Sequence, residues 1–391
     1  MSIVVTGADG YIGWPLVLRL SYRFQHEKII GIDHGGRRRW VAEVGADSCL
    51  PIASFENRVQ AAHEAGYSNL VMLDADLTNY NEVLHCLAKF KPRTILHLAA
   101  QPSAPYSQLS ADHAAYTQRN NTDVTRNLLW AMHELKLRDT LLVVTTTTGI
   151  YGAPDLPIPE GWLEVPAADR GTVRLPWPPM ATSWYHMSRG QDALNLWLAN
   201  FQWGLSILDV RTSIVVGSRT AETQPRADLR TRLDADFYFG VVAHRFAAQA
   251  ILGQPLTIYG KGGQKKPLIT LEDAVESLAN AVQHEPDGNL HVYNQFTQVV
   301  GIKELAQMVK SSAEQHGLDV EIRHIPNPRV EREDHDMRMD NGRFRKVLLP
   351  QQRQSVASAV HDLLSDLSSV PDRLRKLEKT LLPLGARTEV Q

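Results

Sequence analysis

A tyrosine and an arginine four residues apart form the most reactive pair that the sequence suggests. Tyr185 and Arg189 lie in a segment whose pattern predicts a helix over 183–201, so they share one face of it. A guanidinium beside a phenol favours the phenolate and lowers the phenol pKa from about 10, which produces a usable base. A threonine run at 145–148 ends a predicted strand, and one of its hydroxyls can share the substrate proton. Because such a pair is more often a structural contact, its interpretation depends on the surrounding elements.

The chain begins with a strand–turn–helix pattern that carries three glycines. Gly7, Gly10 and Gly13 form G-x-x-G-x-x-G directly after a predicted strand at 3–5. Gly7 permits the tight turn, Gly10 lets a pyrophosphate approach the backbone, and Gly13 lets the helix pack closely on the strand. The pyrophosphate then faces a helix N-terminus, whose free N–H groups and dipole attract an anion. The pattern predicts a dinucleotide-binding loop.

An aspartate about 20 residues beyond this loop indicates which dinucleotide is bound. Asp33 ends the next predicted strand, where a carboxylate accepts hydrogen bonds from the adenosine ribose and repels a 2′-phosphate. We therefore expect NAD rather than NADP. Three arginines at 37–39 favour NADP, but we interpret them as stacking on adenine or lying in solvent, because Asp33 holds the ribose position. Asp76 ends the third predicted strand, and its spacing fits a helix N-cap and an adenine contact equally well.

Short β-branched runs alternate with longer amphipathic runs in the first half of the chain. They predict βαβ units, and hence an α/β fold with a doubly wound, parallel Rossmann sheet. The expected strands are 3–5, 28–32, 70–73, 94–98, 141–145 and 205–210. The expected helices lie near 14–24, 80–90, 122–135 and 183–201, with proline-rich loops at 154–166 and 176–179. Such sheets bind ligands at the carboxyl ends of their strands, where the glycine loop and the threonine run fall.

The pattern changes in the second half, where Arg-rich and Asp-rich stretches and a predicted helix at 241–250 appear. We expect strands near 256–259 and 290–294 to belong to a smaller lobe or to return to the sheet. The expected division is an NAD-binding Rossmann domain at 1–214, a smaller substrate-binding lobe at 215–350 and a polar, helical C-terminal segment at 351–391.

Composition excludes several classes of function. The 391 residues carry 41 basic and 43 acidic side chains, which gives no general electrostatic reason to bind nucleic acid or an anionic membrane. Cys49 and Cys86 are too few and too isolated for a disulfide framework or a thiolate metal site, and the histidines show no metal-ligand spacing. We expect no targeting segment and no membrane-spanning run. We expect a cytoplasmic protein that binds no nucleic acid, membrane or metal.

Longer strings of residues resemble a known family, the NAD-dependent epimerase/dehydratases, or extended short-chain dehydrogenases. The resemblance runs from the glycine loop to about residue 340. Within the family it is strongest to enzymes that attach sulfite to a sugar nucleotide. The strings are GYIGW at 10–14, SAPYS at 103–107, YTQRNN at 116–121, RLD at 232–234, FG at 239–240, RF at 245–246, YGKGGQ at 259–264, NQFT at 294–297 and PNPRVE at 326–331.

The resemblance implies a Rossmann-fold NAD enzyme that acts on a sugar nucleotide or sugar nucleoside, and we expect a homodimer. It assigns catalysis to Thr147, Tyr185 and Arg189. The cofactor contacts that it implies are Gly7, Asp9, Gly10, Tyr11, Ile12, Asp33, His34, Arg37, Asp76, Leu77, Leu98, Asn121, Tyr185 and Arg189. The implied substrate contacts are Gln101, Ser103, Thr147, Arg232, Arg245, Gln264 and Arg329, of which Arg329 would grip a diphosphate.

The family's chemistry begins with transient oxidation of the sugar. The tyrosine, helped by the threonine, removes the proton of the 4-hydroxyl while hydride leaves C4 for NAD. The resulting ketone acidifies the C5 hydrogen, so the C6 hydroxyl can be eliminated to a 5,6-alkene. In the sulfite-using enzymes, sulfite adds at C6 before the hydride returns.

The chain departs from the family pattern at several positions. Arg189 replaces the lysine of Tyr-x-x-x-Lys, which keeps the charge but changes size and geometry. Ile150 stands where the sulfite-using enzymes have an acidic residue, and Ala100 and Pro102 stand where they have a charge pair. These changes fall on the sulfite and hexose side and leave the NAD side alone. They favour oxidation and elimination over sulfite addition.

We therefore expect an NAD-dependent sugar dehydratase that eliminates the C6 hydroxyl and then returns the hydride. The alternatives are a synthase that uses UDP-glucose and sulfite, a sugar-nucleotide epimerase, and an NAD-sensing regulator that has lost catalysis. Tyr185 and Thr147 favour an enzyme, whereas Arg189 keeps the regulator open. His186 is the best remaining general acid/base, although a helix histidine packed away from the pocket is an equally good interpretation.

Overall fold

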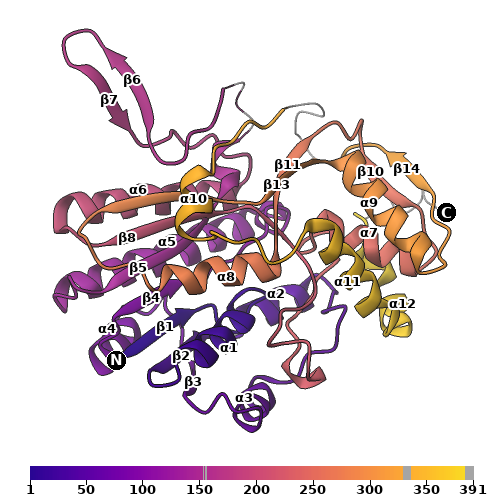
Figure 1. The fold of residues 1–391 in the computed structure, drawn as a ribbon, viewed down its shortest axis with the longest axis horizontal. Coiled ribbons are helices and arrows are strands. Elements are labelled where there is room, and N and C mark those ends of the chain that lie inside the picture. Colours follow the sequence, from indigo (N-terminus) through magenta and orange to yellow (C-terminus); the bar gives the residue numbers. More distant parts are fainter. Residues whose placement is uncertain (153, 155, 329–335, 384–391) are drawn as a thin grey trace.

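The computed structural model describes residues 1–152, 154, 156–328 and 336–383. At its centre is a seven-stranded sheet in the order β12-β8-β5-β4-β1-β2-β3, in which every neighbouring pair is parallel (Figure 1). The strands are β1 (Ser2–Thr6), β2 (Lys28–Asp33), β3 (Leu70–Asp74), β4 (Thr94–His97), β5 (Leu141–Thr147), β8 (Ile207–Thr212) and β12 (Leu290–Gln295). The strand order reverses between β1 and β4, as in the doubly wound Rossmann fold that the sequence predicts.

Apolar residues on both faces of the sheet explain why helices cover both sides. In β1, Ile3 and Val5 join one buried cluster and Val4 joins another, because successive side chains of a strand alternate. The helices on the first face are α1 (Gly13–Arg23), α3 (Phe55–Glu64) and α8 (Leu271–Ala281). Those on the second are α4 (Tyr80–Phe90), α5 (Ala111–Glu134) and α6 (Trp184–Trp203). Within the described residues, no helix is long and apolar enough to cross a bilayer.

Besides a separate hairpin of β6 (Leu163–Ala167) and β7 (Gly171–Leu175), two smaller sheets accompany the central one. The first contains β9 (Ile214–Val216), β11 (Lys265–Thr270) and β13 (Gln298–Gly301), and the second contains β10 (Leu256–Tyr259) and β14 (Ile322–Ile325). An apolar cluster joins them to α7 (Val242–Ile251), α9 (Ile302–Gln315), α11 (Val356–Ser368) and α12 (Pro371–Leu377). A short helix, α10 (Gly342–Val347), packs beside β12. The two strands left open by the sequence therefore separate: β12 returns to the central sheet and β10 does not.

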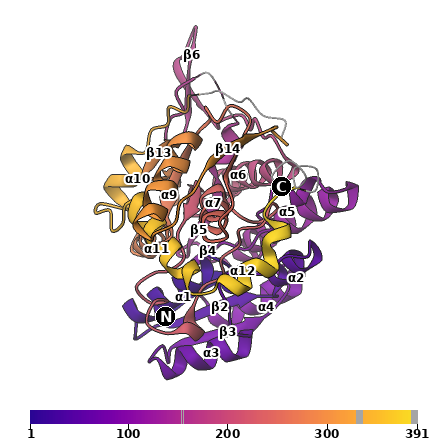
Figure 2. The ribbon, with the colours of Figure 1, turned by 90° about the vertical axis from the view of Figure 1, so that its right-hand side faces the viewer.

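Several local expectations are corrected. A helix expected near 122–135 begins at Ala111, because the Ser110 side chain caps it by accepting the N–H of His113. The loop expected at 154–166 instead contains most of β6, which forms a hairpin with β7 that projects from the body of the protein (Figures 1 and 2). Helix α2 (Gly36–Glu43) and α3 were not expected. The C-terminal segment is not simply polar, because α11 buries Val356, Val360, Leu363, Leu364 and Leu367.

Candidate active site

A cavity of about 1330 Å³ lies at the carboxyl ends of the sheet strands. Gly7 from the loop after β1, Asp33 from β2, Thr147 from β5 and Tyr185 from α6 all line it. Phe239, from the segment before α7, lines it as well. Because pockets for one small ligand usually measure roughly 300–1,000 Å³, this cavity has room for a dinucleotide beside a second ligand.

Most of the residues expected from the sequence lie on the wall of this cavity. The expected cofactor contacts found there are Gly7, Gly10, Tyr11, Ile12, Asp33, His34, Arg37, Asp76, Leu77, Leu98, Tyr185 and Arg189. The expected catalytic and substrate contacts found there are Ser103, Thr147, His186, Arg245 and Gln264. The fold therefore brings side chains that are far apart in the sequence together around one cavity.

The backbone of the glycine loop has the shape needed for a pyrophosphate. Gly7 has a φ of +74°, and a Cβ atom there would lie 2.8 Å from the backbone nitrogen of Ala99. A Cβ atom on Gly13 would lie 2.0 Å from the carbonyl oxygen of Gly7, so the start of α1 packs directly on the loop. These contacts leave no room for side chains, and an anion can approach the backbone N–H groups at the start of the helix.

Asp33 is held at the edge of the cavity by two backbone hydrogen bonds. Its Oδ2 accepts the N–H of Asp9 at 2.9 Å, and its Oδ1 accepts the N–H of Gly35 at 2.8 Å. Burial and the charge of Asp9 raise the pKa of Asp33, while both N–H groups oppose that rise. Each carboxylate oxygen keeps a further lone pair, which can accept a hydrogen bond from a ribose hydroxyl.

The three arginines after Asp33 all have partners within the protein. Arg37 pairs with Asp234 at 2.7 Å and lies 4.3 Å from the centre of the Phe239 ring. Arg38 pairs with Asp9 at 2.6 Å, and Arg39 donates to the carbonyl of His34. Arg37 and Arg38 thus have acidic partners, whereas Arg39 is exposed, as expected for part of this run.

Asp9 and Asp76 have different surroundings from those expected. Asp9 is 2% exposed, and its carboxylate is shared by Arg38 and Arg58, so it anchors the glycine loop from behind the cavity wall. Asp76 lies two residues beyond β3, and the N-cap of α4 is Asn79, so the N-cap interpretation of Asp76 is wrong. Asp76 lines the cavity instead and accepts hydrogen bonds from Thr78.

Tyr185 is hydrogen bonded to Thr147 and lies close to the charge of Arg189. Its backbone N–H donates to the Ser107 hydroxyl at 3.2 Å, which fixes the first turn of α6 against the loop after β4. Burial raises the pKa of Tyr185, while Arg189 and Thr147 oppose the rise. The expected lowering by Arg189 is therefore present, but burial outweighs it, and this corrects the expectation that the pKa falls below its usual value.

His186 lies on the cavity wall and is not packed away from it. Its Nδ1 is 2.9 Å from the Ser183 hydroxyl, and its ring centre is 4.9 Å from that of Tyr185. A Cβ atom on Gly149 would lie 2.1 Å from the His186 ring, so the glycine after the threonine run makes room for the imidazole. This position suits an acid/base beside the tyrosine.

Besides Asp9, three of the expected ligands lie behind the cavity wall. Gln101 and Asn121 are fully buried and bond to each other, with the Gln101 N–H donating to Asn121 Oδ1 at 2.7 Å. Arg232 is 1% exposed and pairs with Asp234 at 2.8 Å. Most of their polar atoms bond to neighbouring residues and so hold the wall together, but Gln101 Nε2 and Arg232 Nη1 have no hydrogen-bond partner among the described residues. Arg329 lies outside the described residues.

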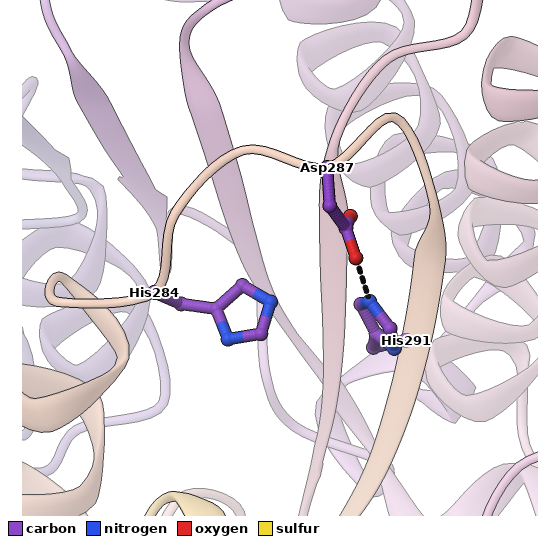
Figure 3. A group of neighbouring side chains, drawn as sticks. All are labelled: His284, Asp287 and His291. Carbon is purple, nitrogen blue, oxygen red and sulfur yellow. Dashed lines mark hydrogen bonds and ion pairs between the residues drawn. The ribbon is translucent and has the colours of Figure 1, made fainter.

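A group of potential metal ligands occurs away from the cavity. Ligand atoms of His284, Asp287 and His291 lie within 4.8 Å of one another (Figure 3). His291 Nε2 bonds to Asp287 at 2.7 Å, and its Nδ1 lies 3.4 Å from a nitrogen of Arg343. Both ring nitrogens therefore have protein partners, and the guanidinium adds positive charge. A hydrogen bond therefore explains the Asp287–His291 pair, and His284 adjoins it through an edge-on ring contact with His291 at 5.3 Å.

Some cavity residues were missed by the sequence analysis. Trp40, Tyr238 and Phe239 line the cavity, but no helix was predicted around Trp40, no motif marks Tyr238, and the FG string at 239–240 was given no site role. Asp192 pairs with Arg189 from the next turn of α6. The three-residue spacing of these opposite charges on a predicted helix was the signal for that pair.

The family model for the NAD dependent epimerase/dehydratase family matches residues 3–294. A UDP-sulfoquinovose synthase of Sulfolobus acidocaldarius is 37% identical over 391 residues, which cover 98% of this chain and 96% of that protein. The chloroplastic UDP-sulfoquinovose synthase of Spinacia oleracea is 36% identical over 334 residues, which cover 85% of this chain and 68% of that protein.

Solved structures share the fold at lower identity. A Thermotoga maritima UDP-glucose 4-epimerase with UDP-glucose has a TM-score of 0.70 at 18% identity, over 94% of this chain and 99% of that chain. A Bacillus cereus UDP-glucuronic acid 4-epimerase with UDP-glucuronic acid and NAD has a TM-score of 0.69 at 19% identity, over the same shares. The protein is thus an enzyme of the NAD-dependent epimerase/dehydratase family, and NAD is its cofactor.

Proposed function

We propose that the enzyme removes water from the sugar of a sugar nucleotide or sugar nucleoside without net oxidation. The proposal is carried by Ala100 and Pro102, which line the cavity where similar sulfite-using enzymes have a charge pair. An apolar wall at these positions offers no charge to bind and orient the sulfite anion. Gly7, Asp33 and Arg189 would hold NAD, which supplies the acceptor and later the donor of a hydride.

Tyr185 acts as the base that removes the proton of the sugar 4-hydroxyl. Its hydrogen bond to Thr147 positions the phenol, and the positive charge of Arg189 favours the phenolate. Oxidation at C4 then makes the C5 hydrogen acidic, because the carbanion beside a ketone is stabilised as an enolate. These side chains therefore prepare the sugar for elimination.

His186 acts as the acid/base of the elimination step. The C5–H and C6–O bonds break, a C5–C6 double bond forms, and the proton and hydroxide leave as water. The C4 ketone afterwards returns to an alcohol, so the product differs from the substrate by one water. The imidazole is suited to this exchange because it lies on the cavity wall beside Tyr185.

Positive side chains on the cavity wall support a substrate that carries phosphate. Arg245 and Lys266 line the cavity, and the guanidinium carbon of Arg245 lies 4.0 Å from the centre of the Tyr259 ring. A diphosphate carries charge that such groups bind. This observation favours a sugar nucleotide over an uncharged sugar nucleoside.

The second candidate is the sulfite-using synthase reaction on UDP-glucose, which the 37% identity over nearly the whole chain favours. The two candidate reactions are distinguished by their products. The NAD-loaded enzyme is incubated with UDP-glucose, with and without sulfite, and separately with candidate sugar nucleosides, and the product masses are measured. Loss of one water that does not depend on sulfite supports the dehydratase. Efficient sulfonation of UDP-glucose overturns it, and Tyr185→Phe serves as the inactive control.

We also propose that two copies associate through α5 and α6, which pack side by side. An apolar surface on these helices remains exposed, and such patches usually mark an interface. Trp197 and Phe201 stack with ring centres 5.6 Å apart, and Phe201 is 74% exposed. The other exposed apolar side chains of the two helices are Trp130, Trp184, Met187, Leu194 and Leu198.

A further inference from the structure

The guanidinium that replaces the family's lysine is fixed by an ion pair within α6. Arg189 Nη1 donates to Asp192 Oδ2 at 2.6 Å, and the two side chains are 1% and 0% exposed. Arg189 Nη2 donates to the carbonyl oxygen of Thr145 at the end of β5. Both terminal nitrogens of Arg189 are thus held by the protein, one by a negative charge and one by a backbone dipole.

Other groups packed around Asp192 do not replace this ion pair. His97 on β4 is neutral, because burial and the nearby Arg189 lower its pKa to about 3. Burial raises the pKa of Asp192 to about 7, opposed chiefly by Arg189 and also by the Thr125 hydroxyl of α5, while Asp209 on β8 adds to the rise. Asp192 therefore carries a negative charge above about pH 7.

Tyr185 experiences both members of the ion pair, with opposite effects. Arg189 favours its phenolate and Asp192 disfavours it, while the Thr147 hydroxyl and the more distant Arg37 also favour it. His186 adjoins the same ring but is held by the Ser183 hydroxyl. Charge effects are strong in such a site, because few water molecules screen them.

We propose that Asp192 is a positioning residue that holds the Arg189 guanidinium in place and partly offsets its charge, so that the pair, and not Arg189 alone, acts on Tyr185. A buried guanidinium without a partner is costly, whereas its planar N–H groups are well suited to a carboxylate. The position of the buried Arg189 guanidinium therefore depends on its ion pair with Asp192. This inference rests on the proposed role of Tyr185 as the base.

The test is Asp192→Asn, which keeps an oxygen that can accept the Arg189 N–H but removes the negative charge. The pH at which Tyr185 is half protonated in the NAD-loaded enzyme should fall by about one pH unit, because the phenolate loses a repulsive neighbour. Tyrosine labelled with ¹³C at the ζ carbon reports this titration by NMR, and Tyr185→Phe identifies the signal. The rise of kcat/KM with pH should move in the same direction.

The control is Asp366→Asn. It neutralises an aspartate of α11 that pairs with Arg219, and it should leave the titration of Tyr185 unchanged. If Asp192→Asn does not fold, Arg189→Met with Asp192→Leu replaces the whole buried pair by apolar residues, which proteins often tolerate. Tyr185 should then titrate at a higher pH than in the parent, since Arg189 exerts the larger of the two charge effects.

The role of Asp192 is overturned if Tyr185 titrates at the same pH in the folded variant as in the parent enzyme. If Tyr185→Phe is inactive in that case, the proposed function stands and only this inference fails. A fully active Tyr185→Phe enzyme overturns the proposed function itself.

Discussion

The carboxylate of Asp33 accepts a hydrogen bond of 2.9 Å from the backbone N–H of Asp9, which joins the end of β2 to the glycine loop. Arg38 and Arg58 hold the side chain of Asp9 from behind. The carboxylate expected at the ribose and the loop expected at the pyrophosphate are therefore parts of one hydrogen-bonded unit. Changes at either end should alter NAD binding together with local stability.

The protein should contain NAD when purified, and Asp33→Arg should remove it. Loss of a hydrogen bond to a charged group costs about 1.5–3 kcal/mol, so the NAD dissociation constant should rise roughly 10- to 150-fold. Asp74→Asn is the matched control, because Asp74 is paired with Asp33 in the sheet but is exposed and lies off the cavity wall. Isothermal titration calorimetry checks both variants. Unaltered NAD affinity in Asp33→Arg would show that the ribose assignment is wrong.

Tyr185→Phe should lower the rate by roughly 10²–10⁴ while NAD stays bound, because only the acid/base hydroxyl is removed. Arg189→Lys should keep measurable activity, since either cation stabilises the phenolate. Single-turnover rates and the NAD content of the same samples test both expectations, with the exposed Tyr22→Phe as control. Full activity in Tyr185→Phe would remove the catalytic assignment.

Gly13→Ala should destabilise the glycine loop and reduce NAD content. The new Cβ would lie 2.0 Å from the Gly7 carbonyl oxygen, a backbone atom that cannot move without opening the loop. Overpacking of this kind costs about 1–3 kcal/mol, and the Tm measured by calorimetry should fall. Gly301→Ala is the control, because its φ is −71° and the nearest contact of its Cβ would be 3.9 Å. Equal Tm values for the two variants would contradict the packing that the structure shows at Gly13.

Replacing both Trp197 and Phe201 by glutamate should produce a monomer. Charge placed on an apolar interface must be desolvated when two copies associate, which weakens the dimer. Sedimentation velocity compares the variant with the parent and with Tyr22→Glu, a similarly exposed aromatic residue on α1. A parent that is already monomeric, or a variant that remains dimeric, would contradict the α5–α6 interface.

The amino-acid sequence by itself determined the central architecture and the location of the cofactor loop. Short apolar runs marked all seven central strands to within about two residues, because a buried parallel strand needs a short apolar segment between turn signals. For the strand near 290–294 the sequence left open whether it joins this sheet. Gly7, Gly13 and Asp33 were identifiable because a dinucleotide loop imposes local spacing on the backbone. The helical spacing of Tyr185 and Arg189 was equally local.

Tertiary structure decided which polar groups pair and what their surroundings do to them. Arg37 meets Asp234, 197 residues away, and Asp9 meets Arg58, 49 residues away, and no local pattern relates such positions. The same packing buries Arg232 behind the cavity wall and places His186 on that wall. It also reversed the expected pKa direction of Tyr185, because desolvation depends on every element packed around the phenol, whereas the sequence showed only the neighbouring charge.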